Sequence, residues 1–532
     1  MNNFPSLYEL SLDAVAGCFE NGILPTHHVE ISPKVREEIF ETVMRIRDYC
    51  YDQHTKELIK MFQPTKLHLK FQMMKEGKFD ELKKLKLVKL RIQGFEWISK
   101  FKEPKPGQSE STAPVIYTFR VGLFLDEILS RETKEGLRVL DLSNHSVSFS
   151  QNRMEELSSM FPNLEDLNIC CRKMCVTDFE SLCSNLPHLR TLNISATGIK
   201  NLNGLAKLQN LECLSIYGLL FETKEDIKDL FELKKLKKLI FGYCSSDWNY
   251  DWFFEKPHRE LETLVCLWHP ADNAFLRRIV PKLPRLQTVV AYETGITQEA
   301  ASPEVSLCTG ESVEAMMKTI GYLRSQSDLR AVLNAFDYFV IVWSEWTEID
   351  VEIPPEQTIL MVNELEAVIR VFKLGNQCLP YLVGQFIGIL EKCLYVDRNH
   401  LNIYKLKVLN ILSKNLRHHL KKRTHPSDNV FINQFVGIEN LIKTTENFNV
   451  DKICSLAMKS IIYGRGLYDG GNSCAVIMEI LMDRMDISLE YYRNINFRKL
   501  HACLRTIQNK ADLWPPRRAS AGNVLRFVEL FM

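Results

Sequence analysis

The chain has 532 residues, of which 45% are hydrophobic and 25% charged, a balance typical of a folded protein long enough for several domains. Its 67 lysines and arginines nearly cancel its 66 aspartates and glutamates, so no overall field attracts nucleic acid or an anionic membrane. No run of about 18 apolar residues predicts a membrane span, and the N-terminus lacks a signal-peptide pattern. The 15 cysteines follow no disulfide framework, which predicts reduced thiols and a cytoplasmic and/or nuclear protein.

A helix is predicted over residues 1–20. Ser6 and Glu9 form a capping box at its start, and Asn21-Gly22 ends it. Apolar and small residues recur at helical spacing along one stripe: Leu7, Leu10, Ser11, Ala14, Val15 and Cys18. From these residues alone, the helix would be expected to cover the end of the repeats that follow.

The segment SLYELSLDAV within this helix resembles the elongin-binding box of cullin–RING ligase substrate receptors. The pattern of that box is Ser/Thr/Pro-Leu-x-x-x-Cys-x-x-x-apolar. Ser6, Leu7 and Val15 match it, and Ser11 takes the place of the cysteine. The resemblance implies that Leu7 anchors in a pocket of elongin C, and that four further residues line the same stripe: Leu10, Ser11, Ala14 and Val15.

A second helix is predicted to begin after Ser32, which acts as N-cap before Pro33 at the first helical position. This segment resembles the cullin-two box that follows the elongin box in these receptors. Pro33, Val35 and Ile39 match the box and would contact cullin-two. Ser32 and Arg36 occupy positions that are apolar in the family. Residues 1–60 are thus predicted to form a helical elongin-box and cullin-box region.

Residues 61–300 are predicted to form a leucine-rich repeat solenoid. The spacing Leu-x-x-Leu-x-Leu, or a close apolar variant, begins at residues 137, 164, 189, 211, 236, 261 and 286, with weaker copies near 64 and 87. A period of 22 to 27 residues with this spacing is typical of about 7–9 leucine-rich repeats. The alternating residues predict a short strand. The returning half, as in FESLCSNL, predicts a helix, and the repeats must stack to bury both apolar faces.

One spacing between the first positions of successive repeats is twice the usual length. The first positions at 87 and 137 lie two periods apart, so a degenerate repeat is expected between them. The segment 102–115 contains the proline, glycine and serine of a loop, and it is expected to interrupt that repeat.

Long helical segments follow the repeats, after about residue 300. A helical connector and linker is predicted over 301–355, and armadillo-like helical repeats are predicted over 356–532. Stretches such as LKVLNILSKNL resemble the third helix of an armadillo repeat. Helices are expected near 311–325, 327–342, 357–373, 378–395, 401–421, 430–443, 450–463, 473–483, 487–507 and 519–530.

This order of segments resembles the Zyg-eleven/Zer-one family of substrate receptors of elongin–cullin-two RING ubiquitin ligases. The family implies an α/β leucine-rich repeat solenoid followed by an all-α armadillo-like solenoid. It also implies three kinds of partner: elongin C with elongin B, cullin-two, and protein substrates. Mammalian members read an N-terminal glycine in a pocket built partly from the motif LWNLTDE. That motif is absent here, because Lys459 or Arg505 lies where its tryptophan would be. Glycine recognition is therefore not carried over, and no substrate-binding residues are assigned.

Four other motifs contain residue types that occur in binding sites for metal, phosphate, nucleic acid or protein. Cys170, Cys171, Cys175 and Cys183 lack the paired Cys-x-x-Cys spacing of a zinc site and are interpreted as structural thiols. GRGLYDGGN (464–472) has no preceding strand and no Gly-Lys-Ser/Thr, so it is interpreted as a loop and not a phosphate site. KNLRHHLKKRTH (414–425) lacks aromatic residues and is interpreted as a solvated helix end. Trp343 and Trp346 are expected to be buried, and would be partner anchors if exposed.

No motif predicts catalysis, a metal site or a cofactor. The sequence therefore favours a non-catalytic substrate-recognition subunit of a cullin-two RING E3 ubiquitin ligase, which presents target proteins for ubiquitination and degradation. The alternative is a ligase-independent scaffold of leucine-rich and armadillo repeats, whose N-terminal helices only cap the solenoid. Near-neutral charge disfavours a nucleic-acid partner.

Overall fold

The computed structural model describes most of the chain: residues 7–20, 31–46, 49, 51–71, 79–93, 98–104, 117–143, 148–149, 154–171, 173–242, 254–256, 258–267, 271–300, 304–326, 329–346, 353–372, 379–392, 401–403, 405–406, 408–410, 412–413, 416–417, 435, 437–439, 441–443, 445, 448–462, 469–482, 495–509 and 515–529. The chain divides into two compact units, Met1–Thr319 and Ile320–Met532. The division falls within helix α9 (Val313–Ser325).

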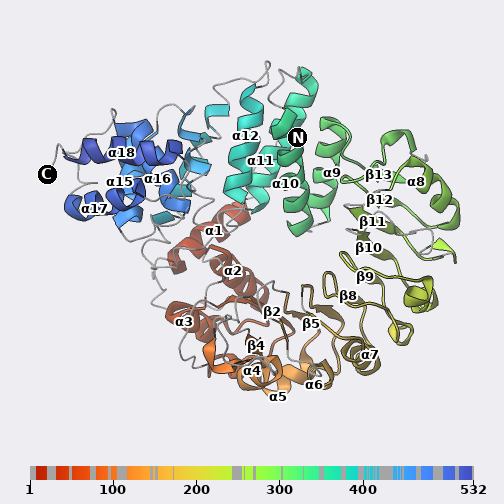
Figure 1. Cartoon of the computed structure of the whole chain (residues 1–532). Coiled ribbons are helices and arrows are strands. Elements are labelled where there is room, and N and C mark those ends of the chain that lie inside the picture. Colours follow the sequence, from red (N-terminus) through yellow and green to blue (C-terminus); the bar gives the residue numbers. More distant parts are fainter. Residues whose placement is uncertain are drawn as a thin grey trace. The chain divides into compact units, whose positions relative to one another are not determined.

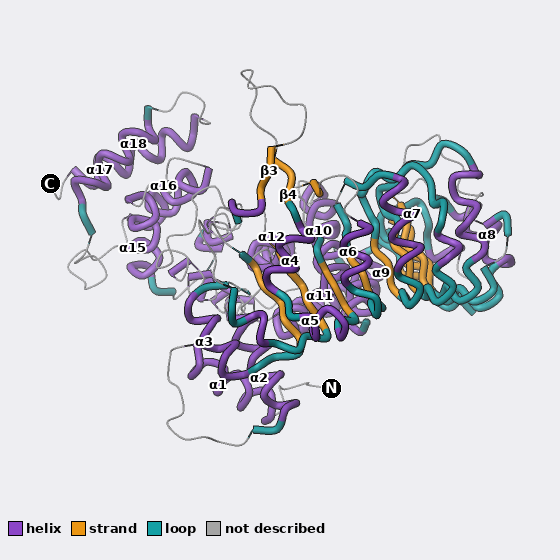
Figure 2. Tube along the Cα trace, turned by 90° about the horizontal axis from the view of Figure 1, so that it is seen from below, coloured by secondary structure: helices purple, strands orange, loops and turns teal. Residues whose placement is uncertain are grey.

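A ten-stranded parallel sheet runs through the first unit (Figures 1 and 2). Its strands, in spatial order, are β1 (Lys66–Lys70), β2 (Lys89–Gln93), β5 (Val139–Asp141), β7 (Asp166–Asn168), β8 (Thr191–Asn193), β9 (Cys213–Ser215), β10 (Lys238–Gly242), β11 (Thr263–Leu267), β12 (Thr288–Val290) and β13 (Ser306–Cys308). The predicted leucine-rich repeats are confirmed, including the two weaker copies that supply β1 and β2. Strand β13 was not predicted and extends the sheet past residue 300.

The repeated leucines form the core of this unit. Leu140, Leu167, Leu192 and Leu214 occupy equivalent strand positions and are 0% exposed. The outer side of the solenoid is made of α4 (Val121–Ile128), α5 (Arg131–Gly136), α6 (Met154–Met160), α7 (Val176–Asn185), α8 (Asn273–Ile279) and the 3₁₀ turns η1 (Leu82–Lys84), η3 (Ser99–Phe101), η4 (Leu205–Lys207), η5 (Lys224–Glu232), η7 (Val280–Lys282) and η8 (Gln298–Ala300). Several repeats therefore return through a 3₁₀ turn where an α-helix was expected.

The degenerate repeat predicted between residues 87 and 137 is wrong. Strand β2 pairs directly with β5, with Arg91 opposite Asp141, so no strand from the intervening segment enters the ten-stranded sheet. The segment instead contains α4, α5 and an antiparallel hairpin, β3 (Lys102–Pro104) and β4 (Tyr117–Phe119). Strand β4 also pairs with β6 (Ser148–Phe149) in a separate small sheet. In Figure 2 the hairpin extends away from the repeats. Residues 105–116 lie outside the described part of the chain.

Three helices precede the sheet: α1 (Leu7–Glu20), α2 (Pro33–Ile46) and α3 (Gln53–Phe62). They pack in sequence, α1 on α2 and α2 on α3, and α2 also contacts the edge strand β1. The Glu37 carboxylate of α2 accepts hydrogen bonds from the backbone N–H groups of Thr65 (3.0 Å) and Lys66 (2.7 Å). The helices thereby cover the start of an edge strand, whose unpaired backbone would otherwise invite aggregation.

The second unit is mostly helical, as predicted. It contains α10 (Leu329–Trp346), α11 (Pro355–Phe372), α12 (Leu379–Lys392), α15 (Val450–Ser460), α16 (Asp469–Leu481), α17 (Phe497–Gln508) and α18 (Pro515–Glu529). The rings of Phe336 and Phe386 stack at 4.7 Å between α10 and α12. In the glycine-rich segment predicted as a loop, the described residues 469–472 belong to helix α16. Pairing of these helices into armadillo repeats stays a prediction.

Several sequence predictions concern particular segments of this unit. Trp343 is buried, with 8% of its surface exposed, and stacks on Phe339 at 5.6 Å. The side chain of Trp346 and most of the basic run 414–425 lie outside the described residues. Among the described helices, none is long and apolar enough to cross a membrane.

Candidate interaction surfaces

One face of α1 is anchored to the other N-terminal helices. Ala16 and Phe19 are buried, and Leu12 is partly buried against the same core. The ring of Phe19 meets that of Phe62 in α3 edge to face at 4.9 Å. A His54 ring nitrogen lies 3.2 Å from the backbone carbonyl of Phe19. These contacts fix how α1 is rotated about its axis.

The opposite face of α1 is solvent-exposed. Ser11, Ala14, Val15 and Cys18 are all exposed, and Val15 shows 40% of its surface. Tyr8, at one border of this face, is 51% exposed, and its hydroxyl donates a hydrogen bond to Glu38 of α2. We call Ser11, Ala14, Val15 and Cys18 the α1 outer face. It contains three of the five residues predicted to contact elongin C, and the side chains of Leu7 and Leu10 lie outside the described residues.

The three residues predicted to contact cullin-two differ in accessibility. Helix α2 begins as expected, with the Val35 N–H donating to the Ser32 hydroxyl at 3.4 Å. Pro33 is exposed and Val35 is half-buried. Ile39 is 4% exposed and belongs to the core. Pro33 and part of Val35 are therefore accessible to a partner, whereas the buried Ile39 packs α2 against the core.

The sheet presents two rows of side chains on the face opposite the buried leucines. The first row runs from β1 to β13 through Lys66, Lys89, Val139, Asp166, Thr191, Cys213, Lys238, Thr263, Thr288 and Ser306. The second row runs through His68, Arg91, Asp141, Asn168, Asn193, Ser215, Ile240, Val265, Val290 and Cys308. Charge is concentrated on the first four strands. No sequence motif singles out these residues, although they occupy the positions on either side of the central leucine of each repeat.

The charged end of these rows contains one ion pair. Arg91 Nε lies 3.1 Å from Asp141 Oδ2. Burial raises the pKa of Asp166 from 3.8 to about 6, while nearby Lys89 opposes this shift and Asp141 adds to it. Burial, and next the charge of Arg91, lowers the pKa of His68 to about 3, which leaves that ring neutral near pH 7. The cations here are therefore lysine and arginine alone.

Asp166 is expected to make stability depend on pH. Because its pKa is raised in the fold, the folded state holds more protons than the unfolded state between about pH 4 and pH 6, and stability falls as pH rises through that window. Because one pKa unit corresponds to about 1.4 kcal/mol, Asp166→Asn should raise the free energy of unfolding at pH 7.5 by up to about 3 kcal/mol. Urea denaturation of both proteins at pH 7.5 and pH 4 tests this, and the difference should disappear at pH 4. An equal gain at both values would contradict the assignment.

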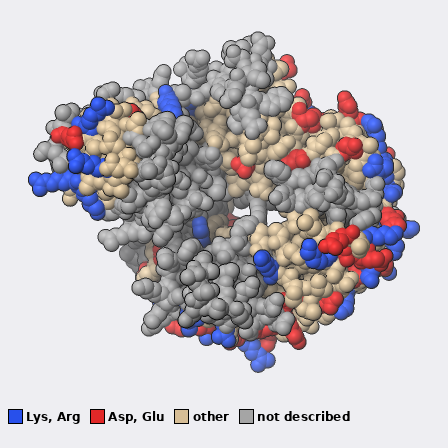
Figure 3. All heavy atoms as spheres, in the orientation of Figure 1, with Lys and Arg blue, Asp and Glu red and all other residues tan. Residues whose placement is uncertain are grey.

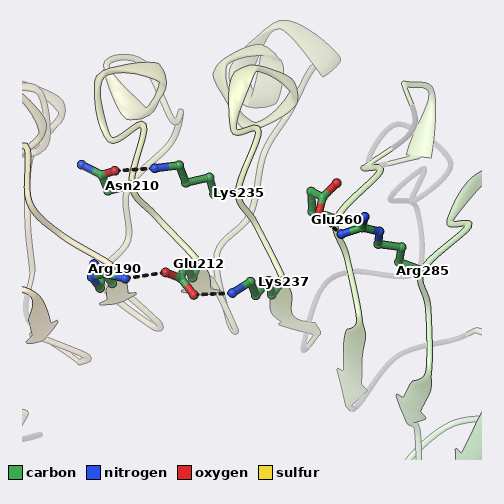
Figure 4. Close-up of polar contacts among 7 residues, drawn as sticks. All are labelled: Arg190, Asn210, Glu212, Lys235, Lys237, Glu260 and Arg285. Atoms are coloured by element: carbon green, nitrogen blue, oxygen red, sulfur yellow. Dashed lines mark hydrogen bonds and ion pairs between the residues drawn. The ribbon is translucent and has the colours of Figure 1, made fainter.

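A third row of charges lies just before the strands, at one edge of the sheet. It alternates in sign through Arg138, Glu165, Arg190, Glu212, Lys237 and Glu262, and we call it the edge row. Glu212 is shared between two repeats, since Arg190 Nη1 and Lys237 Nζ each lie 2.8 Å from one of its oxygens (Figure 4). Arg138 Nη1 lies 3.5 Å from Glu165. Figure 4 also shows Lys235 bonded to Asn210, and Arg285 paired with Glu260.

Glu212→Gln is expected to cost little. Hydrogen bonding to Lys237 lowers the pKa of Glu212, so its contribution is present above its unfolded pKa near 4.5 and is lost as pH falls through the folded value. The pairs lie near solvent, where such bridges contribute about 1 kcal/mol or less. Urea denaturation at pH 7 in low and high salt measures this, and a loss several times larger, insensitive to salt, would show that the edge row is not a surface feature.

The four clustered cysteines, Cys170, Cys171, Cys175 and Cys183, differ in burial. Cys170 and Cys183 are buried, and burial raises the pKa of the Cys183 thiol far above its usual range. Cys175 Sγ lies 3.0 Å from a carboxylate oxygen of Asp178. Within the described parts of the chain, no group of three or more histidine, cysteine, aspartate or glutamate side chains could hold a metal ion.

No protein-family model matches the chain. A curated relative, Gastrulation-defective protein 3 of Caenorhabditis elegans, is 29% identical over 232 residues, which is 40% of this chain and 31% of the relative. The chain thus matches less than a third of the relative's length.

Three solved structures show weak similarity. The yeast Rad7 and Elc1 complex has a TM-score of 0.27 at 13% identity, covering 56% of this chain and 93% of that one. Two internalins of Listeria monocytogenes are similar at this level. Internalin C2 has a TM-score of 0.25 at 18% identity, covering 33% of this chain and 71% of its own. Internalin InlF has a TM-score of 0.26 at 15% identity, and the match covers 48% of this chain and 89% of the internalin chain. The leucine-rich repeat fold itself rests on the ten parallel strands and their periodic buried leucines.

Proposed function

We propose that the protein is a substrate receptor of an elongin–cullin-two RING ubiquitin ligase and that it binds elongin C through α1. The observation that carries this proposal is the division of α1 into two faces. Leu12, Ala16 and Phe19 hold the helix on the N-terminal helices, while Ser11, Ala14 and Val15 of the predicted elongin-binding stripe face solvent. The helix is therefore both fixed in place and accessible.

The α1 outer face is suited to close contact with a protein partner. Ser11 and Ala14 are small, so a partner can approach the helix backbone, and Val15 offers an exposed apolar side chain. Burying such a patch supplies most of the energy of a helix-in-groove interface. Leu7 precedes this face by one helical turn and is proposed as the main anchor.

The cullin contact is proposed through the start of α2. Pro33 and Val35 lie in its first turn, next to α1. Ile39 would act indirectly, by holding α2 in the core. The leucine-rich repeats and the helical unit would then hold the substrate, and the ligase partners would supply the chemistry.

Co-expression with elongin B, elongin C and cullin-two, followed by size-exclusion chromatography, tests the proposal. Wild type is expected to elute with all three partners, and the double variant Leu7→Ala, Val15→Ala is expected to elute alone. Met61→Ala is the matched control, because Met61 of α3 is 42% exposed against 40% for Val15. A complex that survives the double variant would refute binding through α1.

The alternative function is a ligase-independent scaffold, in which α1 only packs on the other N-terminal helices. A helix that only caps the repeats would also bury Ala16 and Phe19. In that case wild type would form no complex although it is well folded.

A further inference from the structure

The first four strands of the sheet bring three cations and two anions together in a fixed order, and one of the cations, Arg91, is paired with Asp141. The order of these strands is β1, β2, β5 and β7. Lys66 and Lys89 are opposite each other in the first row, and both are exposed. Asp141 and Asp166 lie on the next two strands, in the second and first row respectively. The charges thus change sign once across the sheet.

Neither lysine forms a close ion pair with a carboxylate of the described residues, although Lys89 lies near enough to Asp166 to oppose the rise in the pKa of that carboxyl. Arg91 is paired with Asp141 at 3.1 Å. No carboxylate oxygen of the described chain lies within 4.0 Å of Lys66 Nζ or Lys89 Nζ. Exposed surface pairs elsewhere on this unit are plentiful, as in the edge row, and Figure 3 shows basic and acidic side chains side by side over the repeats. Two adjacent lysines without a carboxylate within 4.0 Å are therefore a feature of this site.

The two aspartates have a different environment. Asp166 is only partly exposed, and burial raises its pKa. The Asp141 side chain shows 16% of its surface and also accepts a hydrogen bond from the Ser143 N–H at 2.9 Å. Burial of the Asp166 carboxylate costs stability that an uncharged residue would not, which is common at functional sites. Next to them, Asn168 and Asn193 continue the second row, and their side-chain oxygens accept hydrogen bonds from the N–H groups of Cys170 and Ser195.

From this arrangement we infer that the sheet face over β1, β2, β5 and β7 binds an extended peptide that carries acidic residues next to basic ones. The acidic residues would lie on Lys66 and Lys89, and the basic residues on Asp141 and Asp166. Neighbouring strands lie about 4.8 Å apart, so the centres of the two charged pairs are about 10 Å apart. An extended chain covers about 3.3 Å per residue, which places the two charge types about three residues apart, in either chain direction.

This inference rests on the proposed function only in calling the peptide part of a substrate. The binding itself needs neither elongin nor cullin. Peptide binding is therefore tested with the full chain alone. A negative result would then contradict the peptide site without bearing on whether α1 binds elongin C.

The test is fluorescence anisotropy with four labelled peptides of equal length. They contain Glu-Glu-Thr-Lys-Lys, Glu-Glu-Thr-Glu-Glu, Lys-Lys-Thr-Lys-Lys or Gln-Gln-Thr-Gln-Gln between identical Gly-Ser flanks. The mixed peptide is expected to bind most tightly. The variant Lys66→Glu, Lys89→Glu should weaken its binding by about tenfold or more.

The matched control is Lys228→Glu, Lys234→Glu. Both lysines are exposed, lie in or beside the 3₁₀ turn η5 on the outer side, and change net charge by the same amount. This control should change affinity by about twofold or less. Three results would overturn the inference: an equal loss in the control, an all-acidic peptide that binds as tightly as the mixed one, or no binding by the folded wild type near about 1 mM. Thermal melts of all three proteins establish that each is folded.

Discussion

Ala14→Asp is expected to abolish elongin C binding and leave the fold intact, whereas Ala16→Asp, two residues later, should unfold the N-terminal helices. Ala14 is exposed on the α1 outer face, and Ala16 is 0% exposed in the core. A carboxylate in solvent costs the free protein almost nothing. At an apolar interface with a partner it would be buried without a counter-ion, at a cost of several kcal/mol. At Ala16 the carboxylate would be buried within the protein itself, so the same cost would lower the stability of the fold.

Calorimetric titration with the elongin B–elongin C heterodimer and thermal melts of each variant measure the two effects separately. The pair is matched in chemistry and helix, so only the direction of the side chain differs. If Ala14→Asp bound with wild-type affinity, the α1 outer face would not be the elongin surface. If Ala14→Asp lowered the melting temperature as much as Ala16→Asp, both faces of α1 would be packed within the protein, and neither would be free to bind a partner.

Gly242→Ala is expected to destabilise the repeat unit by about 3 kcal/mol or more. Gly242 ends β10 with φ of +137°, a region that side chains disfavour. A Cβ atom there would lie 1.8 Å from the carbonyl oxygen of Leu267, its partner residue on β11. Because that atom belongs to the backbone of the adjacent strand, the two strands would have to separate.

Gly198→Ala is the matched control for this prediction. Gly198 also has a positive φ, +75°, but a Cβ atom there would have nothing within 4 Å. It should cost only the conformational strain of a left-handed alanine, about 1–2 kcal/mol. Urea denaturation of both variants compares them. Equal losses would mean that the close approach of β10 and β11 at Gly242 is unimportant.

The sequence predicted the repeats well because their spacing is a direct consequence of how they are buried. A leucine in Leu-x-x-Leu-x-Leu has only one environment that suits it, the core between stacked repeats, as Leu192 and Leu214 show. The pattern could not reveal how the segment before Leu137 folds. Its length equals two periods, which mimics a missing repeat, and only the pairing of β2 with β5 excludes one. Strand β13 was missed because only Leu307 of its repeat matches the pattern, whereas Glu304 and Thr309 occupy the other two apolar positions.

The candidate site was less predictable, because α1 is apolar on most sides. Leu12, Ala16 and Phe19 form one stripe, while Ala14, Val15 and Cys18 form another. Helical periodicity identifies both and cannot choose which one is buried. The choice depends on distant residues such as Phe62 and His54, which meet Phe19 only in the folded chain. The sequence did correctly place Ser32 as the N-cap of α2, because that signal is local.

The alternation of sign along the edge row bears on how such a chain can gain or lose repeats. Loss of the single repeat that contains Arg190 would bring Glu165 beside Glu212, two like charges. Loss of two consecutive repeats would leave each remaining acid next to a base. Like charges on neighbouring strands repel one another, whereas opposite charges attract. The edge row thus slightly favours the gain or loss of repeats in pairs, because a change by one repeat would replace a favourable surface pair with a like-charge contact.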